Sequence, residues 1–302
     1  MASLSLKNIC KVYPNGFEAV KNFNLEIADK EFIIFVGPSG CGKSTTLRMI
    51  AGLEDISSGE LKIGDRVVND VEPKDRDIAM VFQNYALYPH MTVYDNMAFG
   101  LKLRKVPKDQ IDKMVREAAK ILDLEPLLDR KPKALSGGQR QRIGIARALA
   151  VDPKFIVCDE PVSALDVSIQ AQVVNMFEDL QKERGLSYLF IAHDLLVVQH
   201  ISDRIAVMYL GHMMELADAD ELMDNPIHPY TQSLLSAVPI PDPETARHSK
   251  RIVLEGDVPS PLRMPSGCPF RSRCKYATEQ CAAARPELTD RGNGHMVACF
   301  NR

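Results

Sequence analysis

The sequence predicts an α/β fold built around a parallel β-sheet, and three observations lead to this prediction. Short apolar runs, which suit parallel strands covered on both faces, recur at 31–36, 154–159, 187–192 and 203–209. Segments with apolar residues at helical spacing lie between these runs. A glycine-rich turn follows the first run and leads into a helix. Strands that alternate with helices in this way predict crossover connections and therefore a parallel sheet.

Composition narrows the classes of protein to which the chain can belong. Its 302 residues are 45% hydrophobic and 25% charged, as expected of a globular protein with one large domain or with a domain and an appendage. The formal net charge of −3 lacks the basic excess of a general nucleic-acid binder. No apolar run approaches the roughly 20 residues needed to cross a bilayer, and the first residues lack the layout of a signal peptide. We therefore expect a cytosolic chain that reaches a membrane only through a partner.

Three further segments are expected to form secondary structure around the sheet. Residues 1–30 alternate apolar and polar side chains, which predicts antiparallel strands. Two later stretches have apolar residues at helical spacing and are expected to pack as helices against the core; the residues are Ile111, Val115, Ala118 and Leu122 in the first, and Ile169, Val173, Phe177 and Leu180 in the second.

The glycine-rich turn reads GPSGCGKST and fits the pattern G-x-x-x-x-G-K-[ST]. Glycines let the backbone wrap around phosphates, and successive amides at a helix N-terminus point inward at them. We expect Lys43 to reach the β- and γ-phosphates of a nucleotide and Ser44 to hold a magnesium ion. A turn without a ligand is the alternative. The other expected phosphate contacts come from Gly37, Ser39, Gly40, Cys41, Gly42 and Thr45.

Two acidic residues follow the apolar run 155–158. Asp159 lies at the expected carboxyl end of that strand, where ligands bind in open α/β sheets. We expect it to coordinate magnesium through water. Glu160 is then placed to orient and deprotonate a water molecule that attacks the γ-phosphate.

The segment ALSGGQRQRIGIARALA lies between these two motifs, and Ser136 is placed to cap a helix that runs to about Ala150. A hydroxyl, glycine amides and a helix dipole together suit a phosphate. Leu-Ser-Gly-Gly-Gln resembles the signature of the ATP-binding-cassette (ABC) ATPases. The resemblance implies that two cassettes pair head to tail around two ATP molecules, each lending its signature to the other's ATP; the signature residues are Ser136, Gly137, Gly138 and Gln139.

The same resemblance implies roles for four further residues. Tyr13 corresponds to the aromatic residue that stacks on adenine, although a turn residue is an equal alternative. Gln83, after the expected strand 77–82, corresponds to the glutamine that touches magnesium and the attacking water and joins the site to a helical subdomain. Asp166, in the SALD sequence, corresponds to the loop that communicates across the dimer. His193, after the run 187–192, corresponds to the histidine that contacts the γ-phosphate. The catalytic set is thus Lys43, Gln83, Glu160 and His193.

The resemblance also implies an organisation and partners. A P-loop ABC nucleotide-binding domain is expected over residues 1–237, with an antiparallel β subdomain and an inserted helical subdomain at about 84–150. The aromatic-rich segment 84–105 resembles the groove that receives a membrane permease. The chain would then work at the cytoplasmic face of a prokaryotic cell membrane, with separate permease subunits and an extracytoplasmic binding protein. A soluble cassette protein of DNA repair or translation is the alternative from another class.

The cargo is ambiguous because the two parts of the sequence resemble different importers. Residues 1–142 resemble the ATPases of sugar importers, whereas residues 143–302 resemble those of oligopeptide and dipeptide importers. Peptide import is the main expectation and sugar import is the alternative. A natural recombination, an engineered fusion and an assembly error would all produce such a junction.

Four of the seven cysteines are in the segment 238–302, which begins with a proline-rich connector: Cys268, Cys274, Cys281 and Cys299. Disulfides are disfavoured in the cytosol, and a structural zinc site usually contains a C-x₂₋₄-C pair, which this segment lacks. The resemblance to peptide-importer ATPases implies a 4Fe–4S cluster; zinc and free thiols are the alternatives. Ligation would let a core-poor segment fold by binding metal.

Overall fold

The computed structural model describes residues 3–192, 195–238 and 251–302. It confirms an α/β fold, with a mixed eight-stranded main sheet in the order β11-β12-β10-β9-β3-β8-β7-β6. Its parallel part is formed by β9 (Arg204–Tyr209), β3 (Phe32–Val36), β8 (Ser187–Ile191), β7 (Phe155–Asp159) and β6 (Ile78–Val81). Antiparallel strands extend one edge: β10 (His212–Asp218), β12 (Met296–Val297) and β11 (Thr289–Asp290).

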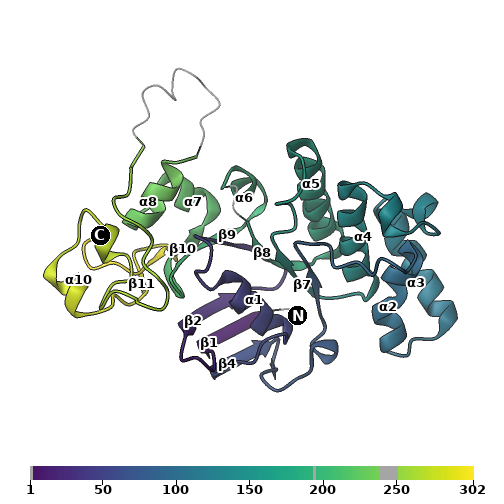
Figure 1. The fold of residues 1–302 in the computed structure, drawn as a ribbon, viewed down its shortest axis with the longest axis horizontal. Coiled ribbons are helices and arrows are strands. Elements are labelled where there is room, and N and C mark those ends of the chain that lie inside the picture. The colour runs from purple at the N-terminus through teal and green to yellow at the C-terminus, as the bar shows by residue number, and fades with distance from the viewer. Residues whose placement is uncertain (1–2, 193–194, 239–250) are drawn as a thin grey trace.

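A second sheet of four antiparallel strands lies beside the main one (Figure 1). Its order is β2-β1-β4-β5, with bounds Glu18–Ile27, Leu4–Val12, Ser58–Ile63 and Arg66–Val67. Alternate residues of β2 are buried, as expected of a sheet with one face on the core. This buried face packs with helix α1 (Lys43–Ala51) and one face of the main sheet, so the antiparallel strands predicted within residues 1–30 are confirmed.

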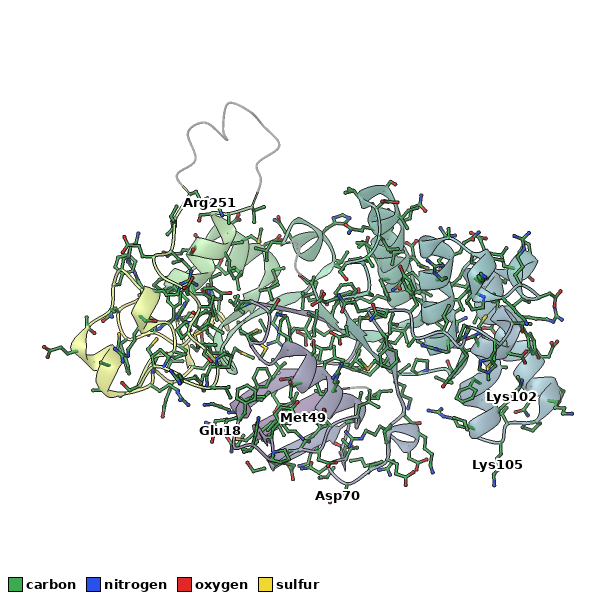
Figure 2. The ribbon with its side chains drawn as sticks, in the orientation of Figure 1. Glu18, Met49, Asp70, Lys102, Lys105 and Arg251 are labelled. Atoms are coloured by element: carbon green, nitrogen blue, oxygen red, sulfur yellow. The ribbon has the colours of Figure 1, made fainter. Side chains whose placement is uncertain are left out.

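Three helices form a group set to one side of the main sheet, α2 (Val93–Leu103), α3 (Lys108–Ile121) and α4 (Gly137–Ala150) (Figure 1). The predicted apolar face of α3 is buried, and Leu122 directly after it is buried as well. Charged side chains such as Lys102 and Lys105 project outward from this group (Figure 2).

Shorter elements and one long helix complete the chain. In α5 (Val167–Arg184), Val173, Phe177 and Leu180 are buried as predicted, and Ile169 is half-buried. Among the described residues the other helices are α6 (Leu195–Ile201), α7 (Ala219–Asp224), α8 (Pro229–Leu235) and α10 (Glu279–Ala283), with 3₁₀ turns at Pro73–Asp75, Glu125–Leu127, Pro132–Ala134 and Arg271–Arg273. Within the described ranges no helix combines the length and apolarity that a membrane crossing requires.

Residues 251–302, called here the C-terminal segment, dock on the main sheet through a small core. Strand β12 pairs with β10, placing Val297 opposite Glu215. Phe270 is 1% exposed, and its ring packs against those of Tyr209 and Tyr230. The expectation that this segment is core-poor is therefore wrong, because the segment uses the apolar surface of β9 and α8 for its core.

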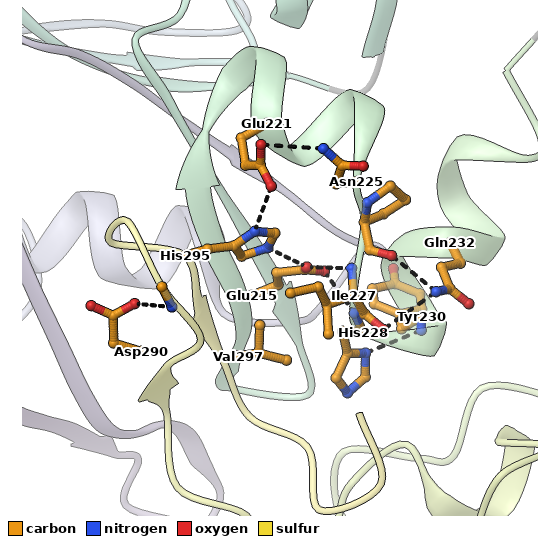
Figure 3. Close-up of polar contacts among 12 residues, drawn as sticks. Glu215, Glu221, Asn225, Ile227, His228, Tyr230, Gln232, Asp290, His295 and Val297 are labelled. Carbon is orange, nitrogen blue, oxygen red and sulfur yellow. Dashed lines mark hydrogen bonds and ion pairs between the residues drawn. The ribbon is translucent and has the colours of Figure 1, made fainter.

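A buried carboxylate also fastens the C-terminal segment (Figure 3). Glu215, 0% exposed, accepts hydrogen bonds from the amides of Ile227 and His228, at 2.7 and 3.1 Å. Its Oε1 also lies 2.7 Å from Nε2 of His295, and Nδ1 of His295 lies 3.5 Å from Glu221. These contacts join β10, the turn before α8 and the C-terminal segment around one buried side chain.

Candidate functional site

The glycine-rich turn joins β3 to α1 and approaches other backbone so closely that two of its glycines are required. Gly37 has φ 153°, and a Cβ there would lie 2.2 Å from the Met208 carbonyl oxygen. Gly42 has φ 98°, and a Cβ there would lie 2.6 Å from the Ala19 carbonyl oxygen. The turn is thus held between the β9–β10 hairpin and β2, with its amides at the N-terminus of α1.

The hairpin supports the turn directly as well, which the sequence analysis missed. The Gly211 amide donates to the Cys41 carbonyl at 2.9 Å. A glycine between two apolar runs, in YLGHMM, was the available signal for this tight hairpin. Cys41 itself is 1% exposed and burial raises the pKa of its thiol, so this residue offers its backbone rather than a reactive sulfur.

Lys43 and Ser44 occupy the start of α1. The Lys43 ammonium group is buried and donates to the carbonyls of Gly37 and Pro38 at 2.7 and 3.0 Å, inside the curve of the turn. Ser44 donates through Oγ to Oδ1 of Asp159 at 2.9 Å. The fold therefore brings together the hydroxyl and the carboxylate that were predicted as magnesium ligands, and oxygen donors are what Mg²⁺ prefers.

Gln83 and Glu160 meet beyond the carboxyl ends of β6 and β7. The Gln83 side-chain amide donates to Oε2 of Glu160 at 2.9 Å and to Oγ of Ser163 at 3.2 Å. Glu160 has φ 48°, a left-handed conformation that is strained for a residue with a Cβ. The expected general base and the expected glutamine are thus in contact, whereas His193 lies outside the described residues.

The signature segment begins α4 with a reciprocal cap. Ser136 Oγ accepts from the Gln139 amide at 3.2 Å, and the Gln139 side chain accepts from the Ser136 amide at 3.0 Å. The predicted helix start is confirmed. Ser136 is exposed and Gly137 and Gly138 are half-buried, so the positive end of α4 faces solvent and can receive an anion.

Two further predicted residues lie next to the ends of elements: Tyr13 directly after β1, and Asp166 directly before α5. Tyr13 follows β1 in a turn, because its amide donates to the Phe17 carbonyl at 2.8 Å and its carbonyl accepts from Gly16. Its half-buried ring stacks with that of Phe17, at a centroid distance of 6.1 Å. Asp166 is the exposed N-cap residue of α5, and its side chain makes no capping bond among the described residues.

The four C-terminal cysteines form no disulfide, and the other three thiols lie close enough to Cys268 to act on its pKa. Burial raises the pKa of Cys268 to about 11, and the three other thiols add to this rise. At Cys281 burial also acts upward, but the contacts of its sulfur with Thr278 and Asn301 outweigh it and lower the pKa. In the part of the chain that the structure describes, no group of three or more His, Cys, Asp or Glu side chains is arranged to hold a metal ion. The thiols thus do not form a ready ligand set.

Two family models match the chain. One, described as ABC transporter, matches residues 20–163, and the other, described as oligopeptide/dipeptide transporter, C-terminal region, matches residues 214–281. The first match agrees with the resemblance to ABC ATPases, and the second agrees with the resemblance of residues 143–302 to peptide-importer ATPases.

Relatives come from both groups of importers, and the peptide-importer relative covers nearly the whole chain. The oligopeptide transport ATP-binding protein OppF of Haemophilus influenzae is 47% identical over 99% of this chain and 94% of the relative. The oligosaccharides import ATP-binding protein MsmX of Bacillus subtilis is 55% identical over 75% of this chain and 62% of the relative. Among solved structures, a dimeric ATP-binding cassette in a post-hydrolysis state with ADP and phosphate matches with TM-score 0.65 and 34% identity, over 72% of this chain and 98% of that one.

Proposed function

The chain belongs to the ATP-binding subunits of ABC transporters, and we propose that it hydrolyses ATP to energise the import of oligopeptides or dipeptides through a separate membrane permease. The observation that carries the ATPase proposal is the meeting of five predicted residues at one edge of the main sheet: Lys43, Ser44, Gln83, Asp159 and Glu160. The peptide cargo is supported by the match of residues 214–281 to the C-terminal region of oligopeptide transporters.

In the proposed mechanism the amides of residues 37–45 and the Lys43 ammonium group bind the phosphates. Lys43 would exchange its two carbonyl contacts for phosphate oxygens, which carry full negative charge. Ser44 and Asp159 would hold magnesium, with Gln83 as a further ligand, and the ion would neutralise charge that develops on the γ-phosphate.

Glu160 would act as the general base that deprotonates the attacking water. In the structure its carboxylate accepts from Gln83, so this contact would rearrange as Gln83 turns to the metal and the water. His193 would contact the γ-phosphate, and Tyr13 would stack on adenine.

The proposed assembly has two cassettes. The exposed cap of α4 would bind the ATP of the second cassette, in a homodimer or with a related subunit, through Ser136, Gly137, Gly138 and Gln139, and Asp166 would lie at the same interface. Segment 84–105 would receive the permease at the cytoplasmic face of the membrane, and a binding protein would deliver cargo from the other side. The cassette would comprise residues 1–237 and the extension residues 238–302.

A sugar cargo is the second candidate, because the oligosaccharide relative is 55% identical over three-quarters of the chain. Co-expression with either a peptide or a sugar permease tests the choice. We expect membrane recruitment and ATP-dependent uptake of labelled peptide with the peptide permease only. Uptake of labelled oligosaccharide with the sugar permease, and no peptide uptake, would reverse the assignment of cargo.

A 4Fe–4S cluster bound by Cys268, Cys274, Cys281 and Cys299 is a separate proposal with no part in this mechanism. It is favoured by the proximity of three thiols to Cys268 and opposed by the lack of a ready ligand set within the described ranges. Anaerobic purification, a visible absorption spectrum and metal analysis test it, with Cys268→Ser as the variant and Cys10→Ser as the control. Iron absorption that is lost in Cys268→Ser but kept in Cys10→Ser supports the cluster. Zinc in place of iron supports a zinc site, and the absence of both metals refutes both kinds of metal site.

A further inference from the structure

The segment that follows Gln83 has a strained backbone. Tyr85 and Ala86 are consecutive residues with φ of 59° and 45°, in the left-handed region that residues with a Cβ rarely adopt. The Ala86 amide also closes a tight turn to the Asn84 carbonyl at 2.5 Å. Such a conformation persists only where the surrounding structure holds it.

Arg147 on α4 supplies that hold. Its Nη1 donates to the Ala86 carbonyl at 2.5 Å and its Nη2 donates to the Tyr85 carbonyl at 3.1 Å. One planar guanidinium therefore binds the carbonyls of both strained residues, a two-pronged geometry that a lysine cannot reproduce. Helix α4 lies close enough for this, since a Cβ on Gly144 would be 3.7 Å from the Tyr85 carbonyl oxygen.

The same segment touches the signature end of α4. The Tyr85 hydroxyl lies 3.5 Å from where a Cβ on Gly137 would be, and the Arg140 guanidinium lies 5.7 Å from the centre of the Tyr85 ring. Tyr85 and Ala86 thus follow Gln83, which contacts Glu160, and pack against α4. Their backbone conformation determines where the Gln83 side chain can reach.

We propose that Arg147 is a positioning residue for Gln83, which it serves by holding Tyr85 and Ala86 in the left-handed conformation that places the Gln83 amide at Glu160. This inference rests on the proposed role of Gln83 in the ATPase reaction. The contacts of Arg147 with the Tyr85 and Ala86 carbonyls let it act on Gln83 through the backbone that follows Gln83.

The test is a rescue experiment on full-length protein, measuring steady-state ATP hydrolysis. Arg147→Gln removes the two-pronged donor, and the loss of preorganisation at Gln83 is expected to lower kcat about 10- to 100-fold while the KM for ATP changes less than about threefold. Ala86→Gly added to Arg147→Gln should restore kcat to within about fivefold of the wild type, because glycine adopts the left-handed conformation without a clamp.

Two controls separate positioning from a general structural role. Arg116→Gln, which breaks an exposed ion pair on α3, should leave kcat within about twofold of the wild type. In a Gln83→Ala background, Arg147→Gln should cause no further loss, since both changes remove the same contribution. A structural defect in the helical group would be neither rescued by Ala86→Gly nor masked by Gln83→Ala.

The outcomes that overturn the proposal are distinct from failure of the proposed function. Wild-type turnover by Arg147→Gln, or a folded Arg147→Gln that Ala86→Gly does not rescue, refutes the positioning role. If Arg147→Gln does not fold, Arg147→Lys replaces it with the same rescue criterion. Full activity of Gln83→Ala also refutes the positioning role but leaves the ATPase intact, whereas wild-type protein without ATP hydrolysis refutes the proposed function itself.

Discussion

At the carboxyl ends of β6 and β7, called here the first edge, Asp159 contacts Ser44 and Glu160 contacts Gln83, and both partners are exposed or half-buried side chains. Where β10 pairs with β12, called here the second edge, Glu215 is fully buried and two of its three partners are backbone amides. Side-chain donors at a surface can be exchanged for a ligand, whereas backbone amides in a core cannot leave without unfolding. The first arrangement therefore suits a binding site, and the second suits a structural fastening.

The largest effect is expected when the Glu160 carboxylate at the first edge is removed. Glu160→Gln keeps the side-chain shape but cannot take a proton from water, so turnover should fall by about 10²- to 10⁴-fold. ATP binding should persist, and ATP should drive the variant to dimerise, as measured by size exclusion with and without nucleotide. Rapid hydrolysis by this variant would remove Glu160 from the role of base.

The next largest effect is expected when the Glu215 carboxylate at the second edge is removed. Glu215→Ala leaves the Ile227 and His228 amides and His295 without their acceptor, so the free energy of unfolding should fall by about 3 kcal/mol. Urea denaturation measures this loss. The affinity of the remaining folded protein for ATP should be unchanged, and an affinity that falls with stability would contradict the separation of the two edges.

Glu221→Gln is the matched control for that variant. Glu221 also contacts His295, but its side chain is 46% exposed, so the expected loss is within about 0.5 kcal/mol.

The third prediction concerns the free energy of unfolding at acidic pH, which depends on buried histidines near the second edge. Burial lowers the pKa of His228 from 6.5 to about 3, so between these values the unfolded chain binds a proton that the folded chain refuses. Stability should therefore fall as the pH drops below about 6.5, by about 1.4 kcal/mol per pH unit for this group, or about 2 kcal/mol by pH 5.

Urea denaturation at several pH values measures that slope. His212, whose pKa burial also lowers to about 3, is expected to contribute similarly. His228→Asn retains an acceptor that can cap α8 in place of the imidazole and should reduce the slope by one proton. An unchanged slope in this variant would show that His228 does not titrate as its burial requires.

The smallest effect compares two helix caps. Ser136 caps α4 and Thr92 caps α2, and replacing either by alanine should cost about 1 kcal/mol of stability. Only Ser136→Ala should also weaken ATP-driven dimerisation, measured in the Glu160→Gln background, because only the α4 cap is proposed to meet the second cassette. Equal dimerisation of the two variants would contradict that role for the signature.

The contrast between the edges also explains what the sequence could predict. Each motif of the nucleotide site is local, and parallel strands place their carboxyl ends at one edge, so the approach of Ser44 to Asp159 and of Gln83 to Glu160 followed from the strand pattern. The apolar faces of α3 and α5 followed from helical spacing.

The second edge could not be predicted in that way. Glu215 and His295 are 80 positions apart, and no local spacing pairs a glutamate in a strand with a histidine near a two-residue strand. Arg147 was missed for a similar reason: an arginine in an amphipathic helix usually indicates a solvated face. Its partners are carbonyls, whose positions depend on the backbone rather than on residue type.

The pairing of β12 with β10 has a consequence for synthesis on the ribosome. The strands that carry the proposed nucleotide site are all made before Met296 and Val297, which cover the edge of β10. A nascent or prematurely terminated chain can therefore form the proposed ATP site while β10 still presents unpaired backbone groups and Glu215 lacks His295. Such an open edge invites association with other chains, so translation errors late in the message endanger solubility rather than nucleotide binding.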